Sequence, residues 1–333
     1  MNRQAENGIL IAGMILCWSV FYAVSKFAVD AIGSPYLAGG LLRAAALIFL
    51  TAQLFLMKKA GLLFKQGKSI WILFVIGTIG FLGDLFANLG YAKGSLGMGT
   101  ALLKTDVLMA NLVTVLIYRK KLTAFDWLGT FIMLGGVLLV LNFDFATAQF
   151  HVYDLFFLLS AGSLAANSFV IKIAQQRYGK DPDIISYFNN LTVLTLFTIA
   201  SAIGGDLGRT GAVIQEFPWQ ILLGGLAQTG IYFFYYRNLQ RHEVWKVKLY
   251  LLLMPVVSCV FGVIFFHEAL TARSIIGIAV VLLGAGLLLL KNRMENRKQI
   301  AETAVDQTAA CGTITKCDKL NLNVEAEEQQ EES

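Results

Sequence analysis

Long apolar runs separated by short polar links make up most of this chain. An apolar run of about 20 residues is long enough to cross the hydrocarbon core of a bilayer as a helix. The pattern predicts ten such spans, near residues 8–28, 36–57, 70–91, 97–117, 124–142, 152–174, 184–204, 218–238, 246–266 and 273–290. Beyond them the sequence becomes polar, and residues 291–333 are therefore expected to form a disordered tail.

The fifth and tenth predicted spans resemble each other, together with the links that precede them. Residues 118–142 read YRKKLTAFDWLGTFIMLGGVLLVLN, and residues 266–292 read FHEALTARSIIGIAVVLLGAGLLLLKN. A shift of 148 residues aligns Leu122 with Leu270, Thr123 with Thr271, Gly129 with Gly277 and Gly136 with Gly284. A shift of 146 aligns the ends of the first and sixth spans, pairing Lys26 with Lys172, Ala28 with Ala174 and Gly33 with Gly179. The chain is therefore predicted to contain one five-span unit twice, in residues 8–142 and 152–290.

Five spans are an odd number, so the second copy enters the membrane in the opposite orientation to the first. Inverted repeats of this kind place a substrate site between the halves, near the middle of the bilayer, and let one half rock against the other. The predicted fold is an all-α polytopic membrane protein with ten transmembrane helices in two inverted five-helix repeats (5+5). This fold favours a secondary transporter that works by alternating access.

Composition and charge agree with a membrane protein and add an orientation. The chain is 56% hydrophobic and 15% charged, which is too apolar for an ordinary soluble domain. Its net charge of +5 is spread over the links and forms no basic patch, so nucleic acid is not an expected partner. Eighteen Lys and Arg residues lie on the side of the two termini and three on the other. Both termini and the tail are therefore expected in the cytoplasm, for a multi-pass protein of a bacterial plasma membrane in contact with lipid.

Several features resemble one transporter family. They are Trp18 in the first span, Arg43 early in the second, the 5+5 repeat, and the ending MPVVSCVFGVIFFHEALTARSIIGIAVVLLGAGLLLL from Met254 to Leu290. Over residues 8–292 the chain resembles an EamA-type permease of the drug/metabolite transporter superfamily. The resemblance implies a secondary transporter, most often an exporter of amino acids, related metabolites or drugs, with a cavity built largely from spans 3, 4, 8 and 9.

Ionisable side chains within the spans are the first candidates for a binding site, because they are costly in a bilayer and usually face a partner or a wet cavity. Arg43, Asp84 and Lys104 each lie about seven residues from the outer end of a span, so they share one level, roughly 10 Å below the surface. Asp106 is turned about 200° from Lys104 on a continuous helix and is expected to point elsewhere.

Polar faces on three spans extend this set. A period of 3.6 residues places Asp84 and Asn88 on one face and Lys104 and Asn111 on a comparable second face. The shift of 148 residues maps the first face onto Gln228, Tyr232 and Tyr236 of the eighth span. We expect Lys104 or Arg43 to hold a substrate carboxylate, and Asp84 to hold an amino group or carry a proton. The candidate substrate-binding residues are Arg43, Asp84, Asn88, Lys104, Asn111, Gln228, Tyr232 and Tyr236, with Asp84 the candidate for coupling to H⁺. This set fits an amino acid, a related zwitterion or an organic anion.

Other interpretations stay open. Arg43, Asp84 and Lys104 could form only a buried brace between helices. The chain could be a proton-coupled exporter of drugs or cationic compounds, or a receptor or scaffold that transports nothing. An enzyme is not expected, because no nucleophile, metal set or acid–base constellation stands out.

The remaining polar residues predict no further chemistry. No cofactor or metal is expected, because the three histidines are scattered along the chain. Four lysines near span ends are expected to reach the membrane interface, namely Lys26, Lys172, Lys246 and Lys248. Cys311 and Cys317 lie in the polar tail and suggest no disulfide framework.

Overall fold

The computed structural model describes residues 3–93, 102–119, 121–141, 152–254, 256–257, 271–287 and 291. The chain divides into two compact units, Met1–Gly284 and Ala285–Ser333, and nearly all of the described residues belong to the first unit. Some of the sequence features fall outside the described residues. They are residues 266–269 (FHEA), the tail that was predicted to be disordered, and Cys311 and Cys317 within that tail.

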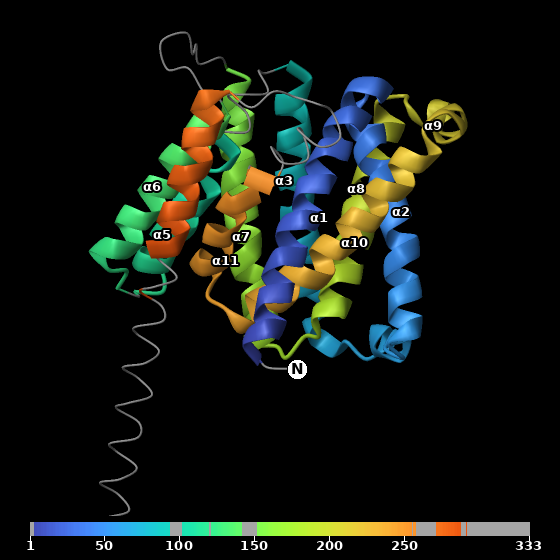
Figure 1. The fold of residues 1–333 in the computed structure, drawn as a ribbon. Helices are drawn as coiled ribbons and strands as arrows, with labels where there is room; N and C mark the ends of the chain where they lie inside the picture. Colours follow the sequence, from blue (N-terminus) through green and yellow to red (C-terminus); the bar gives the residue numbers. More distant parts are fainter. Residues whose placement is uncertain are drawn as a thin grey trace, which may run out of the picture. The chain divides into compact units, whose positions relative to one another are not determined.

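The described residues are helical with short connections, and each predicted span contains a helix (Figure 1). These helices are α1 (Arg3–Ile32), α2 (Pro35–Leu56), α3 (Trp71–Lys93), α5 (Asp106–Leu116), α6 (Ala124–Val140), α7 (Asp154–Gln176), α8 (Pro182–Ile203), α10 (Pro218–Arg241), α11 (Val244–Tyr250) and a last helix, Ala272–Leu287. Short helices lie between or after them: η1 (Ala60–Phe64), η2 (Gly67–Ile70), η3 (Leu207–Arg209), α9 (Thr210–Glu216) and η4 (Leu251–Leu253).

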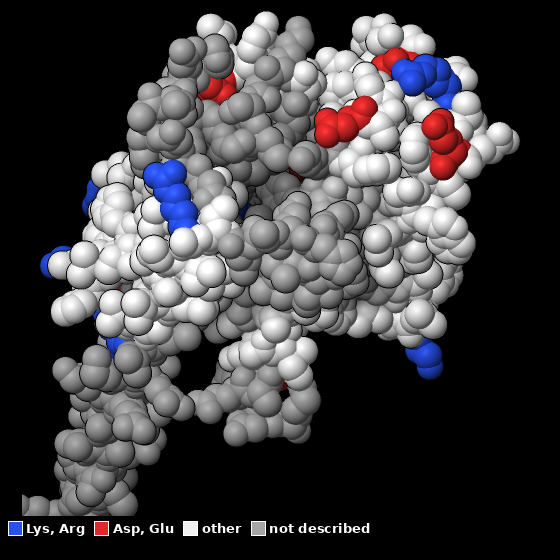
Figure 2. Space-filling model, turned by 45° about the horizontal axis from the view of Figure 1, so that its top comes forward, with Lys and Arg blue, Asp and Glu red and all other residues white. Residues whose placement is uncertain are grey.

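Within the part of the chain that the structure describes, five helical segments are long and apolar enough to cross a membrane by length and composition. They are Glu6–Ile32, Pro35–Leu56, Gly67–Gly90, Asp154–Gln176 and Pro182–Ile203. Large apolar side chains are also exposed on the surface, among them Phe64, Ile203 and Trp219. On the face in Figure 2, the described part of the surface is mostly white, with few Lys, Arg, Asp or Glu side chains. Extensive apolar exposure of this kind suits a protein whose surface meets lipid instead of water.

The turns before α2 and α8 use the same local chemistry. Gly33 and Gly179 have φ angles of 68° and 59°, which glycine adopts without the cost that a Cβ atom imposes. A proline lies shortly after each glycine, in the first turn of the next helix. The residue before that proline caps the helix: Ser34 accepts a hydrogen bond from the Leu37 N–H, and Asp181 from the Asp183 N–H.

The helices pack in pairs that have counterparts in the other half of the chain. α3 packs along α7, and α10 packs along α1. α10 also packs on α2, α3 packs on α8, and α2 packs on α8. When α1, α2 and α3 are matched in order with α7, α8 and α10, the α3–α7 contact corresponds to the α10–α1 contact. The α10–α2 contact likewise corresponds to the α3–α8 contact, and the α2–α8 contact corresponds to itself. α10 therefore occupies the same position relative to the first half that α3 occupies relative to the second.

Glycines permit the closest of these approaches. A Cβ atom at Gly225 of α10 would lie 2.7 Å from the carbonyl carbon of Ala45 in α2, so the backbones could not stay in place. In the same way, a Cβ at Gly277 would lie 2.5 Å from the backbone nitrogen of Val140, and one at Gly136 would lie 3.0 Å from the Gly277 oxygen. Gly136 and Gly277 belong to the two similar segments found in the sequence, so those segments pack directly against each other.

A buried carboxylate joins three helices at the end of the bundle where α1 begins. Asp183 accepts hydrogen bonds from Lys59 Nζ at 2.6 Å, Gln53 Nε2 at 2.8 Å and Arg237 Nη2 at 3.0 Å. Burial lowers the pKa of Lys59, but its hydrogen bonds to Asp181 and Asp183 more than compensate, so the net pKa is raised. Lys59 is therefore charged at neutral pH and holds the end of α2 against the start of α8.

We expect Gly225→Ala to lower the thermal unfolding midpoint of the purified protein in detergent. The added methyl group meets backbone atoms of α2, and overpacking of this kind typically costs about 1–3 kcal/mol. Gly135→Ala is the matched control, because a Cβ there meets nothing within 4 Å. Equal midpoints for the two variants would show that α2 and α10 are not in close contact.

We also expect Asp183→Asn to destabilise the protein, because Lys59 and Arg237 would lose a shared buried counter-charge. Breaking a buried ion pair costs about 3–5 kcal/mol, and the partial exposure of Lys59 places the loss at the lower end. Asp30→Asn, at an exposed position, serves as the control for loss of one carboxylate. A midpoint for Asp183→Asn that matches Asp30→Asn in thermal unfolding would contradict the role given to this carboxylate.

Candidate functional site

Three neighbouring cavities surround Trp18 of α1 and Leu164 of α7, which line all of them. The first cavity extends along α1, α2 and α3 as far as Asn88, and has a volume of about 40 Å³. The second reaches Tyr232 and Tyr236 of α10 and has a volume of about 50 Å³. The third, of about 20 Å³, lies beside the start of α5 and the end of α11. We call the three together the Trp18 cavities.

Arg43 is the centre of the polar wall shared by the first two cavities. Its guanidinium is buried, forms an ion pair with Asp84 of α3, and donates a hydrogen bond of 2.5 Å to the Tyr232 hydroxyl of α10. The side-chain amide of Asn190 donates to the Arg43 carbonyl oxygen at 2.9 Å, which fixes the backbone of α2. Arg43 thus joins α2, α3 and α10 at one point.

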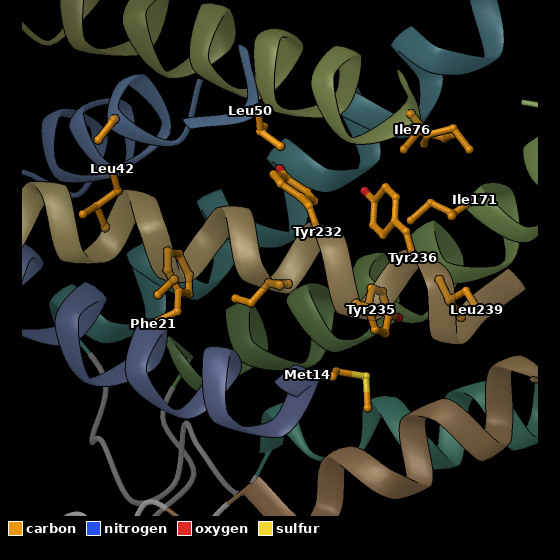
Figure 3. Close-up of a cluster of buried hydrophobic side chains, with 14 of the residues drawn as sticks. Met14, Phe21, Leu42, Leu50, Ile76, Ile171, Tyr232, Tyr235, Tyr236 and Leu239 are labelled. Carbon is orange, nitrogen blue, oxygen red and sulfur yellow. The ribbon is translucent and has the colours of Figure 1, made fainter. Parts of the chain in front are cut away.

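Tyrosines of α10 form the wall opposite Asp84. Figure 3 shows Tyr232 and Tyr236 on one side of the helix and Tyr235 on another. The side-chain amide of Asn189 donates to the Tyr236 hydroxyl, and the Tyr235 hydroxyl shares a hydrogen bond of 2.7 Å with Ser168. The phenols are therefore held in place by α7 and α8.

Four polar atoms that line the second cavity have no hydrogen-bond partner among the described residues. They are the side-chain oxygens of Asn167, Asn189 and Gln228 and the indole nitrogen of Trp18. A buried polar group without a partner costs about 1–3 kcal/mol, so such groups usually mark bound water, an ion or a ligand. Gly80 makes room for one of them, because a Cβ there would lie 2.8 Å from the Asn189 oxygen. The second cavity therefore offers three acceptors and one donor.

The third cavity contains two lysines and one carboxylate. Lys248 of α11 donates to Asp106 of α5 at 2.8 Å, and both side chains are buried. Lys104 lines the same cavity, with its Nζ atom 3.8 Å from the Met254 sulfur and 5.6 Å from the centre of the Tyr22 ring. Among the described residues, no carboxylate lies within ion-pair distance of Lys104.

Two expectations about this cluster are wrong. Asp106 was expected to point away from Lys104, but Lys104 and Thr105 form a turn between two helical segments, so the rotation of a continuous helix does not apply. Lys248 was expected at the membrane interface, but it is 3% exposed because Asp106 neutralises it inside the bundle.

The structure brings most of the predicted site residues together. Arg43 and Asp84 meet as expected, and with Gln228, Tyr232 and Tyr236 they line the second cavity. Lys104 stands apart from that pair, in the third cavity.

The other two predicted residues have structural partners. Asn88 lines the first cavity and donates to the Pro35 carbonyl at 3.2 Å. Asn111 lines none of the Trp18 cavities, and its amide donates to Thr130 of α6 at 3.2 Å.

Sequence reasoning missed several polar residues of the site. Asn167 and Asn189 each interrupt an apolar span, and this interruption was the available signal. Asp106 and Lys248 carried a charge signal that was interpreted incorrectly. Within the described residues, no three His, Cys, Asp or Glu side chains gather where they could hold a metal ion.

Apolar helices around cavities lined by charges and amides are an arrangement that suits a membrane transporter. The sequence model of the EamA-like transporter family matches residues 8–142 and again residues 151–290, so the chain belongs to that family.

Individual relatives agree in length and fold. An uncharacterized transporter of Archaeoglobus fulgidus is 23% identical over 300 residues, which are 86% of this chain and 99% of that protein. A solved crystal structure with 16% identity superposes with a TM-score of 0.66 and covers 86% of this chain and 99% of its own. The second comparison supports the helical fold alone.

A double-mutant cycle tests whether Arg43 and Asp84 are energetically coupled. We expect Arg43→Gln and Asp84→Asn each to lower the thermal unfolding midpoint, because each leaves one buried charge without its partner. The double variant should lose less than the sum, since coupling energies of contacting charged residues are about 0.5–3 kcal/mol. Additive losses would show that the pair does not act as a unit.

Proposed function

We propose that this protein is a secondary transporter that exports a small metabolite, an amino acid or a related zwitterion or organic anion, by alternating access. The two halves, residues 8–142 and 152–290, would be inverted five-helix repeats that rock about the site. Two observations support this arrangement: the family model matches each half separately, and the helix contacts exchange between halves. The charge bias of the links supports cytoplasmic termini.

One observation carries the proposal: the second cavity is lined both by the Arg43–Asp84 ion pair and by amide and phenol groups. Arg43 or Lys104 is the candidate to hold a carboxylate, and the free oxygens of Asn167, Asn189 and Gln228 are candidates to accept hydrogen bonds from an ammonium group. Asp84 is the candidate to hold that ammonium group or to carry a proton. A zwitterion satisfies both kinds of group at once.

The size of the cavities fits a transporter that must change conformation. Volumes of about 20, 40 and 50 Å³ hold a few water molecules, since one water needs roughly 10–15 Å³ measured in this way. A molecule the size of an amino acid can enter only if α1, α7 and α10 move apart. Rocking of one half against the other would open this space.

The same charges argue against an exporter of cationic drugs. Arg43, Lys104 and Lys248 outnumber Asp84 and Asp106 in the Trp18 cavities. An additional cation would be repelled in a medium of low dielectric constant. The expected substrate therefore carries a carboxylate or another anionic group.

The test is untargeted profiling of the growth medium of cells that overproduce the protein. We expect one zwitterion or organic anion to accumulate with the wild type and to fall to the empty-vector level with Asp84→Asn. Asp30→Asn, a neutralised carboxylate at an exposed position, should export as the wild type does. The amount of each variant in the membrane fraction must match.

Two results would contradict the proposal. If media from wild type and empty vector have the same composition, the protein does not export under these conditions. If both Asp84→Asn and Lys104→Gln export at the wild-type rate, the Trp18 cavities are not the substrate site.

A further inference from the structure

The buried charges of the Trp18 cavities do not balance. Arg43 is paired with Asp84, and Lys248 is paired with Asp106. Lys104 is 9% exposed and has no carboxylate partner among the described residues. Over the described residues, the Trp18 cavities therefore hold one positive charge more than the carboxylates that pair with it.

The contacts of Lys104 stabilise its position but do not neutralise it. The Met254 sulfur, 3.8 Å away, is a weak acceptor, and the Tyr22 ring, 5.6 Å away, attracts a cation only through its quadrupole. An isolated buried ammonium group is strongly disfavoured, because it has lost its hydration without gaining a counter-charge. A bound anion beside Lys104 would remove most of that penalty.

The surroundings of Lys104 indicate what kind of anion fits. Lys248 lines the same cavity and adds positive potential, although Asp106 compensates much of its charge. The other walls are largely apolar and include Leu103, Leu164 and Leu251. A small carboxylate with an attached carbon chain meets both requirements, because its oxygens would face the ammonium groups and its carbon atoms the leucines. The cavity of about 20 Å³ holds only one or two water molecules, so such a group enters when the helices around it move apart.

We propose that Lys104 and Lys248, with Asp106, form an anion subsite that takes a carboxylate group. Lys104 contacts the anion directly. Asp106 is a positioning residue, because it holds Lys248 and limits the total positive charge of the subsite. This assignment rests on the proposed transport function and deepens it, by giving the substrate carboxylate a place distinct from the Arg43–Asp84 pair.

Acetate is the probe, because it is the smallest carboxylate with a carbon substituent. The purified full-length protein is unfolded thermally in detergent while acetate replaces chloride at constant ionic strength, with uncharged acetamide as a second probe. We expect acetate to raise the wild-type midpoint by about 2–4 °C at a concentration tenfold above its Kd. Acetamide should leave the midpoint unchanged.

Variants separate the subsite from a general salt effect. Lys104→Gln should lose the acetate-dependent rise, Lys104→Arg should keep it, and Lys68→Gln, at an exposed lysine, should behave as the wild type. Asp106→Asn should strengthen the acetate effect, because Lys248 then also lacks a counter-ion. A purely structural role for Asp106 would not strengthen anion binding. Each variant is compared with itself in chloride, so moderate losses of stability do not affect the result.

Three outcomes would overturn the assignment. They are an acetate effect that persists in Lys104→Gln, no acetate effect in the wild type, and chloride stabilising the wild type as strongly as acetate. The last would assign the subsite to small inorganic anions. Binding of acetate is measured without transport, so the two proposals can fail separately. Acetate binding without export would contradict only the proposed function. Export without acetate binding would contradict only the subsite.

Discussion

The cost of a polar group buried among apolar helices is the constraint on which this structure depends. Backbone groups meet it by forming helices, in which each N–H and C=O finds a partner within its own segment. Charged side chains meet it by pairing across helices. Arg43 of α2 is paired with Asp84 of α3, and Lys248 of α11 is paired with Asp106 of α5. Each pair therefore also holds its two helices in contact.

Glycine contacts complement the ion pairs where no charge is present. Gly225 lets α10 approach the backbone of α2, and Gly136 and Gly277 let α6 approach the last helix. Close approach maximises dispersion contacts, which matter more in lipid because the hydrophobic effect does not drive helices together there. The glycines therefore permit short distances between helices. The ion pairs formed by Arg43 and Lys248 hold α2 to α3 and α11 to α5.

The sequence predicted the features that depend on local chemistry. Helices were predicted from apolar runs, and the turns at Gly33 and Gly179 follow from glycine, a capping residue and proline in fixed order. The meeting of Arg43 and Asp84 was predictable because both spans are regular helices, so depth can be counted along them. Where the helix is interrupted, at Lys104 and Thr105, that count gave the wrong direction for Asp106. Asn111 shows a second limit, since periodicity identifies a polar face but not the neighbour, here Thr130, that covers it. Neutral amides such as Asn167 were missed because they carry no charge signal.

The groups left without partners are therefore informative in a structure that pairs buried charges such as Arg43 and Lys248. The side-chain oxygens of Asn167, Asn189 and Gln228 and the ammonium group of Lys104 all line cavities that meet at Trp18. These groups have already lost their hydration on folding, so a ligand that pairs with them gains each interaction without a further desolvation cost on the protein side. The same groups would destabilise the empty site relative to the occupied one. A transporter needs such a difference, because the free energy of substrate binding is what can shift the balance between its two conformations.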